Sequence, residues 1–321
     1  MSSIAKLVAY LLVAAPIFAA LPAHAQRYPA RTIEIVVAYG AGGSTDQVAR
    51  AVAQRLQERL GQSVVVLNKP GGSGGIGAAM AARANPDGYT LFVGYTGEVA
   101  VVPQISKNVK YSVDDFEPVA ITGIIPLALI VSRNMRANTL AEFIAELRAA
   151  PGKFNFGGGI GAPPHLMGAW FHHLNNLTVN HIPYRGGAQA VGDVIGGHID
   201  MFYGGVAAAK AAIASGAVKV LAVTGDTRST ALPDVPTFQE AGIKDVELAS
   251  WTVLFVPKST PAEIVALLRR ETLAAIGDAK VREMFAAQGV DPSASQDVKA
   301  FLAQERAKWG RVVRELKISM E

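Results

Sequence analysis

The feature that most constrains the fold is an apolar strand pattern that runs through a glycine-rich turn into a helix pattern. Apart from Glu34, residues 33–37 are β-branched and apolar, as expected of a buried parallel strand. Three glycines within residues 40–43 allow a turn that residues with a Cβ resist. Ser44 followed by Gln47 has the spacing of a helix capping box. Such a turn points backbone N–H groups at one spot, so it is either an anion-binding device or only a tight connection.

Residues 1–25 have the pattern of a secretory signal peptide. Lys6 supplies a short basic start, residues 7–21 are apolar, and Ala23-His24-Ala25 fits the small-x-small cleavage rule. The apolar run is short for a membrane-spanning helix, and it contains Pro16. We therefore expect cleavage after this tripeptide and export to the periplasm.

Composition narrows the classes of function. The chain has no cysteine, which excludes disulfides, thiolate metal sites and cysteine nucleophiles. A formal net charge of +4 is too weak and dispersed for a nucleic-acid-binding protein, but it suits an anionic small molecule. With 321 residues, the chain is long enough for two domains.

The rest of the chain alternates strand and helix patterns. Strand patterns at residues 63–67 and 89–93 follow the first turn, with helices between them, and this βαβαβ order predicts a parallel sheet with right-handed crossovers. A second α/β series starts near residue 154, with later strand patterns at 179–182, 199–203, 219–223 and 251–256. Each series contains a strand that leads through a glycine-rich turn into a helix, at Tyr39–Asp46 and at Gly157–His165. Two such turns facing each other would surround one anion.

Other motifs support weaker hypotheses. Gly72-x-Gly74-x-x-Gly77, with Glu98 further on, matches a dinucleotide fingerprint, but Pro70 lengthens the turn that the fingerprint needs to be tight. His165 and His172 share a helix face without the spacing or the acid of a zinc site, so we expect no metal.

For single residues near the turns, the sequence leaves more than one role open. His165 either orients its turn, touches a ligand or is a packed structural residue. Asp200, at a strand pattern, is either a ligand contact or a loop cap. There is no G-x-S-x-G elbow, and Ser44 and Ser73 lack a recognisable local base, which argues against a hydrolase.

Six ordered blocks of sequence, spread over nearly the whole mature chain, carry a family resemblance. They are Tyr39-x-Ala41-Gly42-Gly43-x-x-Asp46-x-x-Ala49-Arg50, Asn68-Lys69-Pro70-Gly71-Gly72-x-Gly74-Gly75-Ile76-Gly77-Ala78, Asn85-Pro86-Asp87-Gly88-Tyr89-Thr90-Leu91, Pro183-Tyr184-Arg185-Gly186, Gly196-Gly197-x-Ile199-Asp200 and Leu232-Pro233-Asp234-Val235-Pro236-Thr237. These blocks resemble the signatures of the Bug family, the solute receptors of tripartite tricarboxylate transporters.

The resemblance implies an α/β, two-lobed type II periplasmic binding protein fold, with two crossover strands and the ligand in the cleft between the lobes. In that family, backbone amides and ordered water in the two glycine-rich turns grip a carboxylate. At Ala162-Pro163-Pro164 the chain departs from the family, which usually has small hydroxyl residues there. Because proline has no N–H, the departure disfavours a tricarboxylate ligand.

We expect lobe one to comprise residues 27–125 plus 250–321, and lobe two residues 126–249. The chain would cross between the lobes near residues 124–130 and 245–252. The C-terminal helices have no adjacent sheet of their own, so they should pack on residues 33–84 of lobe one.

The function implied is that of an exported receptor, not an enzyme, that delivers a small organic carboxylate to a membrane permease. A dicarboxylate or an aromatic carboxylate is favoured, and no cofactor, metal or nucleic acid is expected. The protein is expected to be a monomer. A ligand-sensing subunit and an exported hydrolase or transferase are the alternatives. Arg185 and the turn amides would balance charge, and the expected ligand-binding residues are Tyr39, Gly40, Ala41, Gly42, Gly43, Ser44, Thr45, Asp46, Tyr95, Thr96, Gly159, Gly161, Ala162, His165, Tyr184, Arg185, Asp200 and Tyr203.

Overall fold

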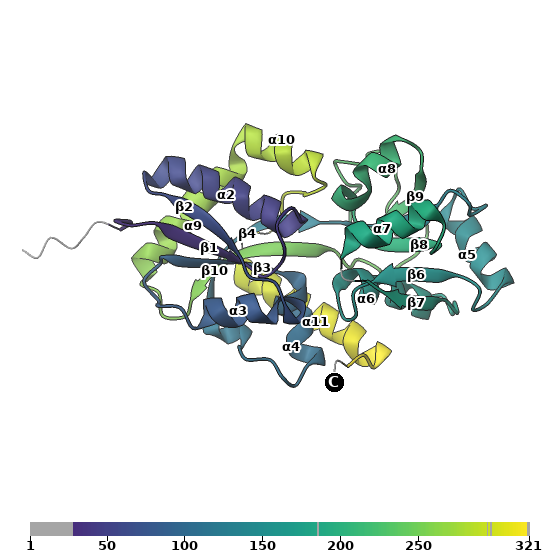
Figure 1. Cartoon of the computed structure of the whole chain (residues 1–321), viewed down its shortest axis with the longest axis horizontal. Helices are drawn as coiled ribbons and strands as arrows, with labels where there is room; N and C mark the ends of the chain where they lie inside the picture. The colour runs from purple at the N-terminus through teal and green to yellow at the C-terminus, as the bar shows by residue number, and fades with distance from the viewer. Residues whose placement is uncertain (1–27, 185, 294, 296, 320–321) are drawn as a thin grey trace, which may run out of the picture.

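The computed structural model describes residues 28–184, 186–293, 295 and 297–319, which form two α/β lobes (Figure 1). Each lobe is built on one five-stranded sheet, with strand orders β2-β1-β3-β10-β4 and β7-β6-β8-β5-β9. The expected signal peptide and Arg185 lie outside the described residues.

Three neighbouring strands of the first sheet are parallel. β1 (Ile33–Val37) pairs in parallel with β2 (Val64–Asn68) and β3 (Thr90–Tyr95), while β10 (Ser250–Pro257) runs antiparallel to β3 and to β4 (Phe116–Ile125). Side chains of β1 alternate between the two faces, and all of its residues except the exposed Glu34 are buried, which explains their apolar character. Ile33, Ile35 and Val37 share a core with α2 (Ser44–Leu60), α9 (Ala262–Gly277) and α10 (Ala279–Ala287). Val36 packs on the opposite face, with α3 (Gly75–Ala82) and α11 (Val298–Leu316).

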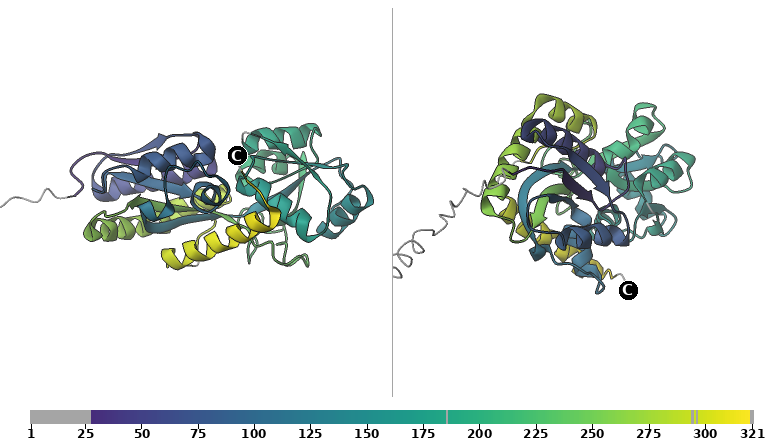
Figure 2. Two further views of the ribbon diagram at one scale, coloured as in Figure 1. Left: turned by 90° about the horizontal axis from the view of Figure 1, so that it is seen from below. Right: turned by 60° about the vertical axis from the view of Figure 1, so that its left-hand side comes forward.

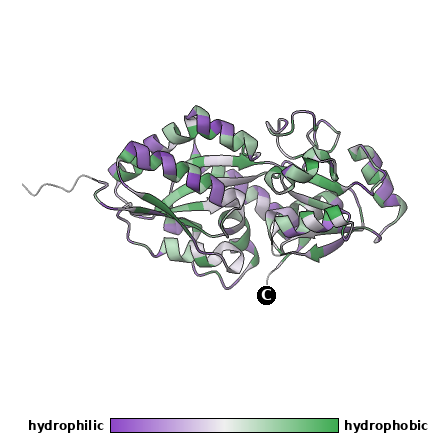
Figure 3. Cartoon of the chain, turned by 45° about the horizontal axis from the view of Figure 1, so that its top comes forward, coloured by the Kyte–Doolittle hydropathy of each residue, from purple (hydrophilic) through white to green (hydrophobic). Residues whose placement is uncertain are grey.

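The second sheet repeats this plan. β6 (Asn155–Gly158) pairs in parallel with β7 (Asn180–Pro183) and β8 (Met201–Gly205), and β5 (Leu127–Ser132) runs antiparallel to β8 and to β9 (Val218–Val223). Its helices are α5 (Leu140–Ala149), α6 (Pro163–Leu174), α7 (Gly187–Gly196) and α8 (Lys210–Ala214). Short helical segments complete the described chain: η1 (Gly72–Gly74), η2 (Gly97–Val101), α4 (Val102–Ile105), η3 (Val113–Asp115) and η4 (Val206–Ala209). Figure 3 shows apolar residues concentrated in the strands and polar residues on the outer sides of the helices.

The two links between the sheets lie side by side. Pro126 alone separates β4 of the first sheet from β5 of the second. The chain returns to the first sheet at β10, where Ser250 pairs with Ile125 and Trp251 with Ile124. Because both links sit at one place, a small change of backbone angles there could rotate one lobe against the other.

The C-terminal helices pack mainly on the first lobe, as the sequence predicts. α9 joins α2 through ion pairs from Arg59 to Glu271 (2.6 Å) and from Arg55 to Asp278 (2.9 Å). α11 continues beyond this lobe and contacts α6 of the second lobe, as the left view of Figure 2 shows. It therefore touches both lobes, which the sequence did not indicate.

Element boundaries differ modestly from the sequence predictions. α2 starts at Ser44, the residue expected to cap it, and it ends at Leu60, followed by Gly61 in the left-handed region (φ 66°). α6 starts at Pro163, since proline is well suited to the first turn of a helix. Within the described part of the chain, no helix has the length and apolar character needed to cross a membrane.

Candidate functional site

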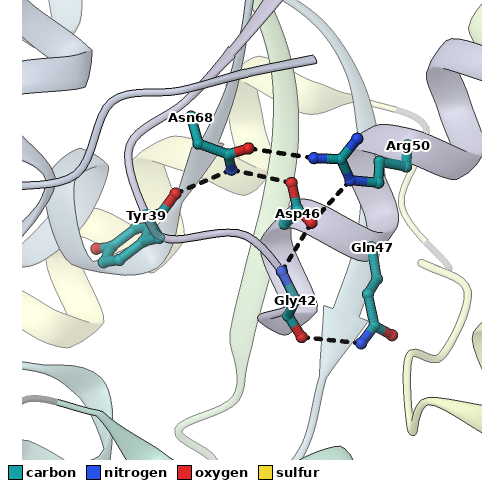
Figure 4. A network of polar contacts seen from close by, with 6 residues as sticks. All are labelled: Tyr39, Gly42, Asp46, Gln47, Arg50 and Asn68. Carbon is teal, nitrogen blue, oxygen red and sulfur yellow. Dashed lines mark hydrogen bonds and ion pairs between the residues drawn. The ribbon is translucent and has the colours of Figure 1, made fainter.

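The first glycine-rich turn is held in shape by the carboxylate of Asp46, near the start of α2 (Figure 4). Its Oδ2 accepts hydrogen bonds from Gly42 N and Arg50 Nε, both at 2.9 Å. Its Oδ1 accepts one from Asn68 Nδ2 (2.9 Å), and the same amide donates to Tyr39 O (3.0 Å). Burial alone would raise the pKa of Asp46, but the hydrogen bonds from Arg50, Gly42 and Asn68 bring this pKa below its usual value. Asp46 is only 2% exposed, so it organises the turn from beneath.

The predicted capping box at Ser44 and Gln47 is wrong. Gly43 is the N-cap of α2, and no side chain among the described residues caps this helix. Gln47 Nε2 instead donates to Gly42 O (3.0 Å). By helix geometry, the N–H groups of the first turn have no acceptor within the helix, so they are free to face an anion.

A second loop of the first lobe, residues 69–74, forms a wall of the site that the sequence prediction missed. Gly71, Gly72 and Gly74 have φ values of 131°, 57° and 92°, which side-chain-bearing residues rarely adopt. A Cβ on Gly74 would lie 3.0 Å from Glu98 Oε2, so this loop packs directly on buried structure. The loop follows β2, which is a parallel neighbour of β1, and loops after neighbouring parallel strands lie at the same end of a sheet. This strand order could have predicted that the loop lies beside the first turn.

The glycine-rich turn of the second lobe leads from β6 into α6. Gly161 has a φ of 69°, and its N–H donates to His165 Nδ1 (3.1 Å). Burial, together with the nearby His181, lowers the pKa of His165 to about 4. The ring is therefore neutral at pH 7 and can accept this hydrogen bond, so His165 orients the turn.

Tyr184 borders the same turn from the end of β7. Its hydroxyl donates to Asp193 Oδ2 (2.6 Å), which fixes the ring, and a Cβ on Gly159 would lie 3.2 Å from Tyr184 O. Pro163 occupies the first position of α6 and lacks an N–H, so this helix start has fewer donors than α2.

A cavity of about 1170 Å³ lies between these turns and takes its walls from both lobes. The first lobe contributes Ala38, Tyr39, Gly40, Pro70, Gly71, Gly72, Ser73, Gly74, Gly97 and Val102, and the second contributes Gly159, Ile160, Gly161, Ala162, Pro183, Tyr184 and Gln189. None of these described lining residues carries a charged side chain. Among the described residues, backbone N–H groups and helix dipoles would therefore have to balance the charge of an anion bound here.

The structure brings part of the predicted set to this cavity. Six of the predicted residues line it: Tyr39, Gly40, Gly159, Gly161, Ala162 and Tyr184. The rest of the first turn continues beside the cavity, where a Cβ on Gly205 of β8 would lie 3.9 Å from Ser44 Oγ. The start of α2 therefore faces the end of β8 across the two lobes.

The prediction that Tyr203 lines the cleft is wrong. Its side chain is fully buried, with Oη 2.9 Å from His172 Nε2. Tyr203 and Met201 alternate with Phe202 along β8, so they point into the core beneath α6.

Asp200 is also far from the cavity. Its Oδ2 accepts a hydrogen bond from Asn155 N (2.7 Å), which joins the starts of β8 and β6. The second glycine-rich turn follows the C-terminal end of β6, whereas Asp200 lies at the N-terminal ends of β6 and β8, on the opposite side of the sheet from the turn.

Tyr95 and Thr96 support the link between β3 and β10. Tyr95 Oη donates to Ser250 Oγ (2.8 Å), and the ring meets Tyr39 edge-on, with 5.5 Å between the centroids. Thr96 is fully buried, and its Oγ1 accepts from Trp251 N (2.7 Å). Thr96 therefore lies in the core, which corrects the expectation that it contacts ligand. Tyr95 is half-buried beside Tyr39 and is not one of the residues that line the cavity.

Two α/β lobes that enclose a cavity, with a helix start on each wall, define a two-lobed binding protein. Residues 48–318 match the model of the tripartite tricarboxylate transporter family receptor. The chain belongs to this family, and it is a solute-binding receptor rather than an enzyme. The family resemblance and the expected fold are both confirmed.

Individual relatives agree with this assignment. BugT of Bordetella pertussis is 36% identical over 301 residues, which cover 92% of each chain. The solved structure of R. palustris Rpa4515 with adipate has a TM-score of 0.84 and 31% identity, covering 91% of this chain and 99% of that one. The periplasmic binding protein BugD has a TM-score of 0.80 and 31% identity, covering 92% of this chain and 100% of that one.

Proposed function

We propose that this receptor captures a small organic carboxylate between its lobes and delivers it to a membrane permease of the tripartite tricarboxylate type. The observation that carries the proposal is the cavity, whose described lining is uncharged and which lies between the helix starts of α2 and α6. Backbone N–H groups at a helix start bind anions without a neighbouring cation.

We further propose a dicarboxylate or an aromatic carboxylate as the ligand. Donors on opposite walls suit a negative group at each end of one molecule. Between them, Val102, Ile160 and Pro183 offer apolar surface, and Tyr39 and Tyr184 offer rings. Burying an aromatic ring or a methylene chain there would contribute about 1–3 kcal/mol. The adipate in the Rpa4515 structure is such an extended diacid.

Capture would proceed by closure of the lobes, which we divide as residues 27–125 plus 250–321 and residues 126–249. The adjacent strand links at Ile125 and Ser250 support this division. Two hydrogen bonds would join the lobes away from the cavity, from Lys210 Nζ to Ala287 O (2.8 Å) and from Thr230 Oγ1 to Asp291 Oδ1 (2.6 Å). A ligand that contacts both walls binds the closed state better and so shifts the population toward it.

Calorimetry of the mature protein with citrate, succinate, adipate, benzoate and terephthalate tests the ligand class. Gly40 lines the cavity, and a Cβ there would meet nothing within 4 Å, so Gly40→Leu fills the cavity without straining the fold. The control is Gly192→Leu on α7, where a Cβ also meets nothing within 4 Å. We expect Gly40→Leu to weaken binding at least tenfold and the control to leave it unchanged. Tight binding of citrate alone would overturn the ligand class.

Delivery is tested by uptake of the bound acid into cells that carry the permease, with and without this receptor. We expect uptake to require the receptor and to fail with Gly40→Leu. Binding without any effect on uptake would favour a sensing role instead.

A further inference from the structure

A buried carboxyl group, that of Glu98, lies directly beneath the wall of the cavity. The residue is 0% exposed and sits in η2. Its Oε2 accepts a hydrogen bond from Tyr39 Oη (2.7 Å), and its Oε1 accepts one from Tyr95 N (2.7 Å). A Cβ on Gly74 would lie 3.0 Å from Oε2 and 3.1 Å from Tyr39 Oη. Tyr39 and Gly74 both line the cavity, so a ligand there would lie close to the carboxyl group.

Among the described residues, no cationic side chain bonds to the carboxyl group of Glu98. Burial is the largest influence on the group, and the only polar side chain that bonds to its carboxyl among the described residues is that of Tyr39. The backbone O of Glu98 accepts from Tyr111 Oη (2.6 Å). The ionisable side chains closest to Glu98 are those of Tyr39, Tyr95 and Tyr111. The helix α11, which packs against η2, carries Glu305 and Lys308, paired with each other (2.6 Å), and also Lys299, Arg306, Arg311, Arg314 and Glu315.

Both protonation states of Glu98 can keep their hydrogen bonds. When the group is ionised, Tyr39 Oη donates to Oε2. When the group is neutral, its own O–H can donate to Tyr39 Oη, and the tyrosine hydrogen can turn toward Ser73 O, 3.5 Å away, or toward a ligand. Burial raises the pKa of Glu98 to about 7, against the lowering effect of the bonds from Tyr39 and Tyr95. The carboxyl group can therefore gain or lose its proton near neutral pH while its hydrogen bonds keep the side chain in position.

We propose that Glu98 takes up a proton when an anionic ligand enters the cavity, so that ligand capture is coupled to protonation of the receptor. The inference rests on the proposed function, because it needs an anion in the cavity. A negative ligand disfavours the ionised carboxyl group and so raises the pKa of the bound state above that of the free state. Affinity should therefore rise as the pH falls through these two values, by about tenfold for each unit by which the ligand raises the pKa.

The test is calorimetry with adipate at about pH 7.5, in two buffers of different ionisation enthalpy, followed by affinities from about pH 6.5 to 8.5. The carboxyl groups of adipate stay ionised over most of this range, since model carboxyl groups titrate at about 4. We expect net proton uptake and weaker binding at high pH for the wild type. Glu98→Gln, which imitates the neutral acid, should bind without proton uptake and as tightly at high pH as the wild type does at low pH. Glu34→Gln on β1, an exposed carboxyl group, is the control and should behave as the wild type.

Two results would overturn the inference: binding without proton uptake in the wild type, or proton uptake that persists in Glu98→Gln. If adipate does not bind, terephthalate and succinate are used in the same way. If none of the panel binds, the proposed function fails with this inference. The two failures are distinguishable, because failure of this inference alone still leaves a binding heat to measure, whereas failure of the proposed function shows no binding heat at all.

Discussion

The turn that starts α2 should collapse when Asp46 loses its carboxylate, and the structure allows the loss to be estimated. Asp46→Ala leaves Gly42 N–H and the Asn68 amide without their acceptor. A hydrogen bond to a charged group contributes about 1.5–3 kcal/mol, and both donors lie near the surface, where water can replace the carboxylate, so the lower figure applies to each. Arg50 is 54% exposed, so its ion pair adds less than about 1 kcal/mol. We expect Asp46→Ala to lower the free energy of unfolding by about 3 kcal/mol.

Urea unfolding followed by tryptophan fluorescence measures this loss, because Trp170, Trp251 and Trp309 are all buried. Asp46→Asn should be intermediate, since the amide retains one acceptor but turns its NH₂ toward another donor. Arg50→Ala is the matched control and should cost less than about 1 kcal/mol. Ligand affinity should fall for Asp46→Ala, because the N–H groups of the turn are no longer held in place.

The opposite pattern would refute this reasoning. If Asp46→Ala unfolds at the same urea concentration as the wild type while binding is lost, then Asp46 contacts the ligand and does not organise the turn. If Arg50→Ala is as destabilising as Asp46→Ala, then the ion pair stabilises the turn and the hydrogen bonds from Gly42 and Asn68 do not.

Three further outcomes are expected. The pKa of Glu98 is raised to about 7 in the folded state, so the wild type should lose up to about 3 kcal/mol of stability as the pH rises from about 4.5 to above 7. The difference between wild type and Glu98→Gln in urea midpoints over this range measures that loss, and a constant difference would contradict it. Tyr203→Phe removes the hydrogen bond with His172 and should lower the free energy of unfolding by about 1 kcal/mol. The ligand affinity measured by calorimetry should stay unchanged, and weaker binding would indicate that Tyr203 contributes to the binding site. Protein recovered from the periplasm should have the mass expected for cleavage after Ala25. An intact mass that includes Met1, on protein recovered from the membrane fraction, would disprove this cleavage.

The sequence alone determined the local elements and the family. The strand at residues 33–37 and the glycine-rich turn that leads from it into a helix were both predicted correctly. Their signals come from backbone sterics and from the periods of strands and helices, which act within a few residues. The order of strands and helices also indicated two α/β series, and the matched blocks indicated the receptor family and, through it, the two-lobed fold.

The tertiary structure decided which side chains meet. Tyr203 and Phe202 are neighbours in an apolar strand, and only the pairing of β8 with β5 and β6 sends Tyr203 into the core beneath α6. Glu98 resembled a ribose-binding acid in the sequence, but the packing of β1, β3 and η1 around it buries it under Tyr39 and Gly74. The loop at residues 69–74 became a cavity wall only because β2 lies beside β1. Such contacts join residues far apart in the chain, and their distances depend on strand register and on the docking of the two lobes, neither of which a local pattern contains.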